Sequence, residues 1–254
     1  MDYNPQIEQK CCSEDSMSQK LKVLAIHGYR QNGEKFREKT GKFRKTVRKW
    51  AQFTFITAPH KVIPVDDSND LNKSQEPDIE QSQDEELYAW FFNRDDNTYR
   101  GIRDGGPAIG FEESVKLIEQ IFTEEGPFDG LVGFSQGACF VGLLCAMQQR
   151  GLTKFNFGFA VLAAGFKSEC FPHLKYYSDR INLPSLHIFG ENDKINPTES
   201  SEALSNCFED PVIVRHPDGH YLPASAAEKP QYRKFFELQL LRKQCTEQQV
   251  EKTV

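Results

Sequence analysis

Three side chains that lie far apart along the chain have the types and order needed for nucleophilic attack on a carbonyl carbon. Ser135 precedes Asp193 by 58 positions, and Asp193 precedes His220 by 27. A serine hydroxyl attacks only when a base removes its proton, and an imidazole can take that proton and return it to the leaving group. A carboxylate fixes the imidazole tautomer and stabilises its charged form. We therefore predict Ser135 as the nucleophile, His220 as the base and Asp193 as the acid.

Ser135 lies between Gly133 and Gly137, after an apolar run at 128–132 and before another at 138–141. This pattern is typical of a nucleophile elbow, where a strand turns sharply into a helix and small residues relieve the crowding of the backbone. The positive end of the helix then faces the hydroxyl. The pattern also occurs in glycine-rich turns that have no catalytic role. The prediction of a catalytic serine therefore depends on the acid and the base further along the chain.

Two short apolar runs deliver those partners. The run at 186–189 ends at Gly190 and leads to Asp193, and the run at 212–214 leads to His220. The order of nucleophile, acid and histidine is that of the α/β-hydrolase triad.

Alternatives exist for the acid and for the base. Glu191 lies two positions before Asp193 and is the second choice for the acid, because it is expected nearer the strand end. Asp218 is interpreted as a turn former, since neighbouring loop residues rarely face each other as a triad requires. Three other histidines are weaker candidates for the base: His173, His187 and His216. His187 lies in an apolar run, and His216 comes four residues too early in the chain.

The oxyanion of the reaction requires two backbone donors. One is the amide of Gln136, which follows the nucleophile, and the other is expected in the loop after the first strand of the fold. That loop begins at His27, and Gly28 lets the chain turn with its backbone exposed, so the amide of Tyr29 is predicted as the second donor. His27 itself is interpreted as a structural hydrogen-bonding residue.

Strands that alternate with helices predict a mostly parallel sheet covered on both faces, the α/β class. The apolar runs show no two-residue alternation, as expected for strands buried on both sides. The predicted strands are Leu21–His27, Gln52–Thr57, Phe128–Phe134, Asn156–Ala163, Ser185–Phe189 and Val212–Arg215. The predicted helices are Gly33–Trp50, Phe111–Glu125, Gln136–Arg150, Thr198–Asn206 and Ala226–Lys243. Six strands suffice for an α/β-hydrolase core, and its triad lies at the carboxyl edge of the sheet.

Several segments together resemble a known family. They are Leu21–Gly41, Gly126–Ala138, Leu183–Gly190 and the loop that holds His220, within a likeness that spans about Leu21 to Leu241. These segments resemble the small serine hydrolases that include the ovarian-cancer-associated gene 2 esterase and the yeast family-of-serine-hydrolases proteins. The most specific parts are 27–32 and 36–41, because the serine elbow is shared with many other hydrolases.

The resemblance implies an esterase with Ser135 as nucleophile, Asp193 as acid, His220 as base and an oxyanion hole near Tyr29 and Gln136. It also implies carboxylic ester substrates, including ones with medium to long acyl or alkyl chains. An acyl-thioesterase is the alternative within the enzyme class, since the same triad would serve. A binding protein that keeps the scaffold without turnover is disfavoured, because no triad position is missing. The partner is then a small-molecule ester, and neither a metal nor an organic cofactor is expected.

Composition agrees with one domain at 20–243 between a disordered polar tail at 1–19 and a polar tail at 244–254. The formal net charge of the 254 residues is −6. A predicted mobile acidic insert at 66–86 holds nine acids and one lysine, or −8, so the rest totals +2. The basic run at 35–49 is interpreted as the solvated face of a helix, and no nucleic-acid partner is predicted.

A cytoplasmic protein is expected. The first 19 residues are polar and lack the apolar core of a signal peptide, and no apolar run approaches the ~20 residues that span a bilayer. Seven cysteines without framework spacing fit reduced thiols, and Cys11 and Cys12 are expected to be exposed and unmodified.

Aromatic residues follow the acidic insert. We expect Trp90, Phe91 and Phe92 to wall an acyl pocket beside the nucleophile, with Tyr221 and Leu222 opposite. The alternative is that the three aromatic residues pack the insert onto the domain.

Overall fold

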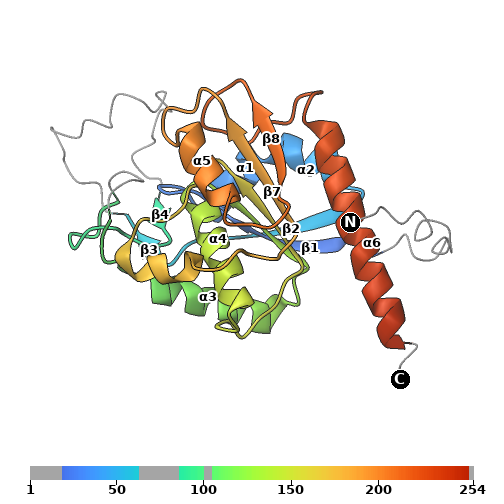
Figure 1. Cartoon of the computed structure of the whole chain (residues 1–254), viewed down its shortest axis with the longest axis horizontal. Helices are drawn as coiled ribbons and strands as arrows, with labels where there is room; N and C mark the ends of the chain where they lie inside the picture. Colours follow the sequence, from blue (N-terminus) through green and yellow to red (C-terminus); the bar gives the residue numbers. More distant parts are fainter. Residues whose placement is uncertain (1–18, 63–85, 100–104, 252–254) are drawn as a thin grey trace.

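A computed structural model describes residues 19–62, 86–99 and 105–251. Six parallel strands form one twisted sheet in the order β2-β1-β5-β6-β7-β8 (Figure 1). Their bounds are β1 Leu21–Ile26, β2 Ala51–Ile56, β5 Gly130–Phe134, β6 Phe159–Ala163, β7 Ser185–Gly190 and β8 Val212–His216. The predicted parallel sheet and its six strands are confirmed, with strand ends shifted by up to a few residues.

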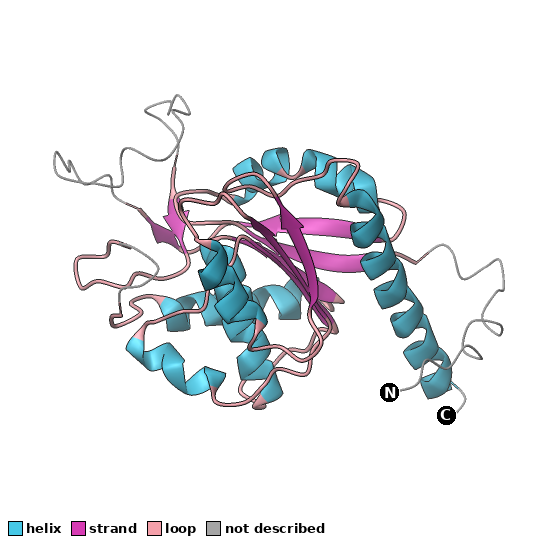
Figure 2. Ribbon diagram, turned by 45° about the horizontal axis from the view of Figure 1, so that its top comes forward, coloured by secondary structure: helices cyan, strands magenta, loops and turns pink. Residues whose placement is uncertain are grey.

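Helices cover both faces of the sheet (Figure 2). One face carries α1 Gly33–Lys39, α2 Gly41–Val47 and α6 Lys229–Glu251, whose Phe36, Phe43 and Phe236 share one apolar core. The other face carries α3 Phe111–Glu125, α4 Gln136–Gln149, α5 Thr198–Ser205 and the 3-10 helix η4 Phe171–Tyr177 over a second core. The sheet thus separates two apolar layers.

The three strands β5, β6 and β7 are largely apolar because both of their faces are covered. In β5, β6 and β7 every residue is buried, which explains the absence of alternation in their sequences. Helix α4 is buried from Gln136 to Met147, since it lies under the other helices of its face. Burial on all sides holds the start of α4, and therefore the serine turn before it, in a fixed position.

The predicted single helix at 33–50 is wrong: it is two helices that meet at Thr40. The Thr40 hydroxyl donates to the Phe36 carbonyl at 2.7 Å, so the side chain competes with the helical backbone there. Gly41 then begins α2.

The last helix differs from the prediction at both ends. It starts at Lys229, after a turn at 225–228 in which the Glu228 carboxylate accepts the Ser225 amide at 2.7 Å. It runs past Lys243 to Glu251, since no glycine or proline interrupts the polar sequence.

A small hairpin lies in the region that the sequence analysis left irregular. It pairs β3 His60–Lys61 with β4 Tyr88–Ala89, and Tyr88 also forms a bridge with Gln31 after β1. Two strands of two residues carry too little pattern to be predicted. Residues 66–85 of the insert predicted at 66–86 lie outside the described residues, as do the first 18 residues, which include Cys11 and Cys12.

Candidate active site

Ser135 stands at the turn between β5 and α4 in a strained backbone conformation, with φ 53° and ψ −119°. A side chain at Gly133 would collide with the carbonyl of Gly137, and one at Gly137 would collide with the carbonyls of Ile26 and His27. Both glycines are therefore required by close backbone packing around the serine. The Ser135 amide donates to the Ala163 carbonyl at 2.9 Å, which holds the turn to β6.

The loop after β1 passes directly beside the nucleophile. A Cβ atom added at Gly28 would lie 3.2 Å from the Cβ atom of Ser135. Tyr29 follows in this loop, and Gln136 is the first residue of α4, whose leading amides have no acceptor within the helix. The loop that holds Tyr29 and the start of α4 at Gln136 therefore both lie next to Ser135.

Asp193 and His220 form the one histidine–carboxylate pair among the described residues. The Nδ1 atom of His220 lies 2.7 Å from Oδ2 of Asp193. The other oxygen of Asp193 accepts the amides of Ile195 and Asn196, each at 2.9 Å. The carboxylate is wholly buried, while 15% of the His220 side chain is exposed. With Nδ1 bound to the acid, Nε2 is the ring nitrogen left to act as a base.

The pair lies on the same edge of the sheet as Ser135. Asp193 follows β7 and His220 follows β8, and both strands run parallel to β5. The ring of His220 contacts that of Phe134, the residue before Ser135, with centroids 4.9 Å apart. Glu191, the alternative acid, is exposed.

The other histidines make different contacts, and all six of the chain lie in the described ranges. His27 donates from Nδ1 to the Gly28 carbonyl at 2.7 Å and accepts the Ala58 amide at Nε2, as a structural residue would. The remaining four are His60 against the Gly110 carbonyl, His173 against Ser168, His187 against Ser185 and His216 with no partner for either ring nitrogen.

Burial keeps three of these rings neutral. It lowers the pKa of His27 to about 4 and those of His173 and His187 to about 3. Burial also lowers the pKa of His216, against the opposing effect of nearby carboxylates that include Asp218 and Glu228. None of these imidazoles is placed like that of His220, which meets a carboxylate and remains partly exposed.

The free energy of unfolding should fall steeply as the pH drops from 6.5 toward 4. In this window the unfolded chain protonates His27, His173 and His187 while the folded chain does not, so unfolding takes up protons. Each histidine contributes at most ~1.4 kcal/mol per pH unit. Urea unfolding at pH 7.5, 6.5, 5.5 and 4.5 measures the slope.

A His187→Gln variant is the matched comparison for this slope. At pH 7.5 it reports only the change in packing, because the ring is neutral in both states. Below pH 6.5 it should lose ~1.4 kcal/mol per pH unit of the wild-type slope. An unchanged slope would contradict a neutral buried ring at position 187.

The side chain of Gln136 makes a contact that the sequence did not reveal. Its Oε1 accepts the Trp90 amide at 3.0 Å, and its Nε2 donates to the Phe91 carbonyl at 2.8 Å. Trp90 also donates from its indole to the His27 carbonyl at 2.7 Å. The segment after β4 is thus tied to the loop after β1 and to the first residue of α4. Contacts between a side chain and a distant backbone segment leave no mark in the residue pattern.

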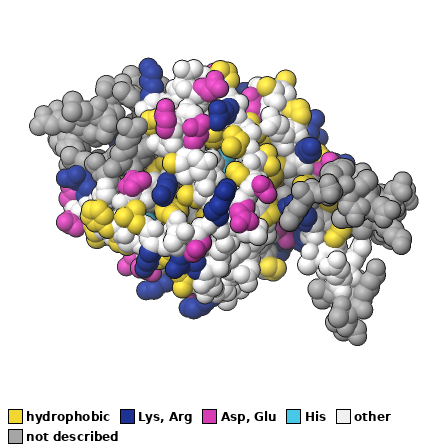
Figure 3. All heavy atoms as spheres, in the orientation of Figure 1, with side chains coloured by type: hydrophobic (Ala, Val, Ile, Leu, Met, Phe, Trp, Pro, Cys, Tyr) yellow, Lys and Arg dark blue, Asp and Glu magenta, His cyan; other side chains and the backbone are white. Residues whose placement is uncertain are grey.

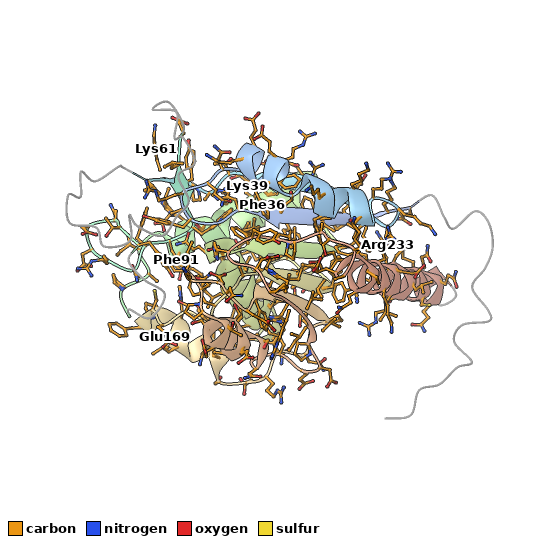
Figure 4. All side chains as sticks on the ribbon, turned by 90° about the horizontal axis from the view of Figure 1, so that it is seen from above. Phe36, Lys39, Lys61, Phe91, Glu169 and Arg233 are labelled. Carbon is orange, nitrogen blue, oxygen red and sulfur yellow. The ribbon has the colours of Figure 1, made fainter. Side chains whose placement is uncertain are left out.

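The aromatic residues of the expected acyl pocket are buried to different extents. Trp90 and Phe91 are wholly buried and Phe92 is 4% exposed, whereas Tyr221 is 44% exposed and Leu222 is half-buried. The Trp90 ring stacks on Phe140 of α4, and Figure 4 marks Phe91 on the segment after β4. Burial favours the packing alternative for the first three and leaves the last two available to a ligand.

A half-buried tyrosine cluster borders the loop after β1 that holds Tyr29. The ring of Tyr99 contacts those of Tyr29, Phe91 and Phe166, with centroids 5.4, 5.7 and 6.2 Å apart. Tyr99 lies nine residues beyond Trp90 in a polar stretch, and its isolated position carries no periodic signal. Sequence reasoning therefore missed it as a neighbour of the site.

In the described part of the chain, no group of three or more histidine, cysteine, aspartate or glutamate side chains is placed to hold a metal ion. Over the same residues, no helix is long and apolar enough to cross a bilayer. The five cysteines of these ranges are free thiols.

A parallel six-stranded sheet with helices on both faces and a strained serine turn after a central strand defines an α/β-hydrolase. Residues 17–232 match the serine hydrolase family FSH1. The chain belongs to this family and is a serine hydrolase, as the resemblance predicted.

Relatives and solved structures agree with this assignment. An esterase of Anopheles gambiae is 49% identical over 87% of this chain and 79% of its own length. The esterase OVCA2 of Danio rerio is 39% identical over 85% of this chain and 96% of its own. The acyl-protein thioesterase 2 of Zea mays shares the fold, with a TM-score of 0.61 at 16% identity, over 87% of this chain and 94% of its own.

Proposed function

We propose that this protein hydrolyses carboxylic esters through a triad of Ser135, His220 and Asp193. The observation that carries the proposal is the 2.7 Å contact between His220 and the buried carboxylate of Asp193, at the sheet edge where the strained serine turn stands. The esterase names of relatives at 39–49% identity support the same reaction. Membership of the family shows that the protein is a serine hydrolase. The assignment of the three catalytic residues is our proposal.

The reaction proceeds in two halves. Ser135 Oγ attacks the ester carbonyl while Nε2 of His220 takes its proton, and the oxyanion accepts hydrogen bonds from the amides of Gln136 and Tyr29. His220 then protonates the departing alcohol, which leaves an acyl group on the serine. Water activated by His220 releases the acid and restores Ser135.

Labelling with a fluorophosphonate probe tests the proposed nucleophile. We expect stoichiometric labelling of the folded protein at Ser135, identified by mass spectrometry of the modified peptide. Protein unfolded in urea should not react, because activation requires the folded His220. A probe that modified another serine, or none, would refute the assignment.

We propose that the substrates carry medium to long acyl or alkyl chains, held between the tyrosine cluster of Tyr29 and Tyr99 on one side and Tyr221 and Leu222 on the other. Aromatic surface beside a nucleophile favours an apolar chain, since each methylene removed from water contributes about 0.8 kcal/mol. The side chain of Tyr221 is held by its hydroxyl, which donates to Asp218 at 2.6 Å.

The Tyr221→Ala variant should raise KM for p-nitrophenyl octanoate about fivefold and leave KM for the acetate within about twofold. The buried Trp90 provides a contrast: Trp90→Ala should lower kcat/KM for both esters together, because it disturbs packing against the loop after β1. A loss confined to the octanoate would instead place Trp90 in the pocket wall. Equal effects of Tyr221→Ala on both esters would exclude Tyr221 from it.

Thioester hydrolysis is the second candidate, favoured by the structural likeness to the thioesterase of Zea mays. The same triad would cleave either bond. Matched octanoyl oxygen and sulfur esters, compared by kcat/KM, distinguish the two reactions.

A further inference from the structure

The sheet ends at β2, and among the described residues nothing pairs with its outer edge. Leu21 donates its amide to the Trp50 carbonyl at 2.8 Å and is registered with Ala51. In a parallel ladder alternate residues bond to the same neighbour, so Gln52 and Thr54 also face β1. The main-chain groups of Phe53 and Phe55 therefore point away from the sheet.

β2 lacks the usual protection of an edge strand. Natural edges carry charged residues or proline that prevent pairing with another chain. The six residues of β2 contain neither a charge nor a proline. Phe53, Thr54 and Phe55 are half-buried. The ring of Phe53 contacts Phe43 of α2, and the ring of Phe55 contacts Phe36 of α1.

A hollow of about 640 Å³ runs along this edge, between β2 and the helices α1 and α2. Its charged lining is basic throughout: Arg37, Arg44, Lys45 and Arg48. On the face seen in Figure 3, by contrast, acidic and basic side chains are interspersed. A lining of one sign favours an anionic ligand.

Arg44 is the most constrained of these cations. Its Nη2 donates to the Arg37 carbonyl at 2.9 Å, and its guanidinium lies 5.5 Å from the centre of the Phe55 ring. Its Nε atom is buried and has no hydrogen-bond partner. Burial, followed by the nearby charge of Arg37, lowers its pKa. A carboxylate in the hollow would give the Nε atom a hydrogen-bond partner and would offset the repulsion between the charges of Arg44 and Arg37.

We propose that the hollow binds an extended acidic peptide segment of another protein, which adds to β2 as a further strand. The outward amides and carbonyls of Phe53 and Phe55 would form the ladder, and carboxylates on alternate residues would meet Arg37, Lys45 and Arg48. A second copy of this chain is disfavoured as the occupant, because pairing of two such edges would bring the basic residues of both copies together.

The proposal is tested with the fluorescein-labelled peptide acetyl-(Thr-Glu)₄-amide and the full-length protein. Binding is followed by fluorescence anisotropy, and hydrogen exchange of single amides is followed by NMR with and without the peptide. We expect the amides of Phe53 and Phe55 to exchange about tenfold more slowly when the peptide is bound. The amides of Gln52 and Thr54, already bonded to β1, should change little.

Two comparisons separate strand addition from charge attraction alone. The same peptide with every amide nitrogen methylated keeps its charge but cannot pair, and its affinity should fall at least about tenfold. The variant Arg37→Glu/Arg48→Glu should also lose about tenfold or more. Lys42→Glu/Lys49→Glu makes the same charge change beside the hollow and should lose less than about threefold.

Ester hydrolysis by all variants serves as the control for folding, since none of these residues lies in the proposed active site. Equal binding of the methylated peptide, or unchanged exchange at Phe53 and Phe55, would overturn the proposal. So would equally tight competition by a single-stranded oligonucleotide of the same charge, because it would show a general polyanion surface.

Discussion

Replacing Ser135 by alanine should lower kcat for ester hydrolysis by about 10⁵-fold, because no other group in the site can form the acyl intermediate. The fold should persist. The positive φ of 53° strains alanine and serine alike, and the Ser135 backbone contacts to Ala163 and Cys139 do not involve the hydroxyl. Burst and steady-state kinetics with p-nitrophenyl butyrate, beside a thermal melt, measure the two effects.

Ser178→Ala is the matched control, since Ser178 is an exposed serine on the surface. It should retain wild-type kinetics. Turnover of Ser135→Ala within about tenfold of wild type would remove the proposed mechanism.

Asp193→Asn should lower kcat/KM by about 10⁴-fold with little change in the positions of the neighbouring atoms. One oxygen of Asp193 accepts the amides of Ile195 and Asn196, so the asparagine must keep its oxygen there. Its NH₂ group then faces Nδ1 of His220. The ring must accept at Nδ1 and carry its proton on Nε2, which can no longer take a proton from Ser135.

Glu191→Gln tests the competing acid by the same isosteric change two residues earlier. Because Glu191 is exposed, this variant should keep activity within about twofold of wild type. The opposite ranking of the two variants would transfer the role of the acid to Glu191. The His220 ring can be followed directly by the nitrogen chemical shifts of its imidazole, which distinguish the two tautomers.

Much of the fold could be predicted because its elements carry strong local patterns. Continuous apolar runs predicted the buried strands. The glycines around Ser135 predicted the sharp turn, because only glycine fits where the backbone segments pack so closely. Asp193 and His220 could be proposed from their places after such runs, since parallel strands end at the same edge.

What the sequence did not predict depends on contacts between distant segments or on competition at single residues. The break at Thr40 comes from a hydroxyl that bonds to the preceding turn, in a stretch that otherwise favours one helix. Long-range packing brings the Tyr99 ring against Tyr29 and the Trp90 amide against the Gln136 side chain. The burial of Trp90 likewise follows from tertiary structure. A run of aromatic residues has the same sequence pattern in a core as in a pocket wall, so the pattern does not distinguish the two.

The bracket that Gln136 forms with the main chain of Trp90 and Phe91 bears on any attempt to redesign this enzyme by loop grafting. A transplanted segment between β2 and α3 would have to offer one amide and one carbonyl at the same spacing, whatever its length or side chains. Grafts that satisfy this requirement can vary the chemistry around the entrance while the reacting groups keep their places. Grafts that do not meet this requirement would leave the Gln136 side chain without its two partners. We expect such grafts to lower kcat more than they lower the free energy of unfolding of the domain.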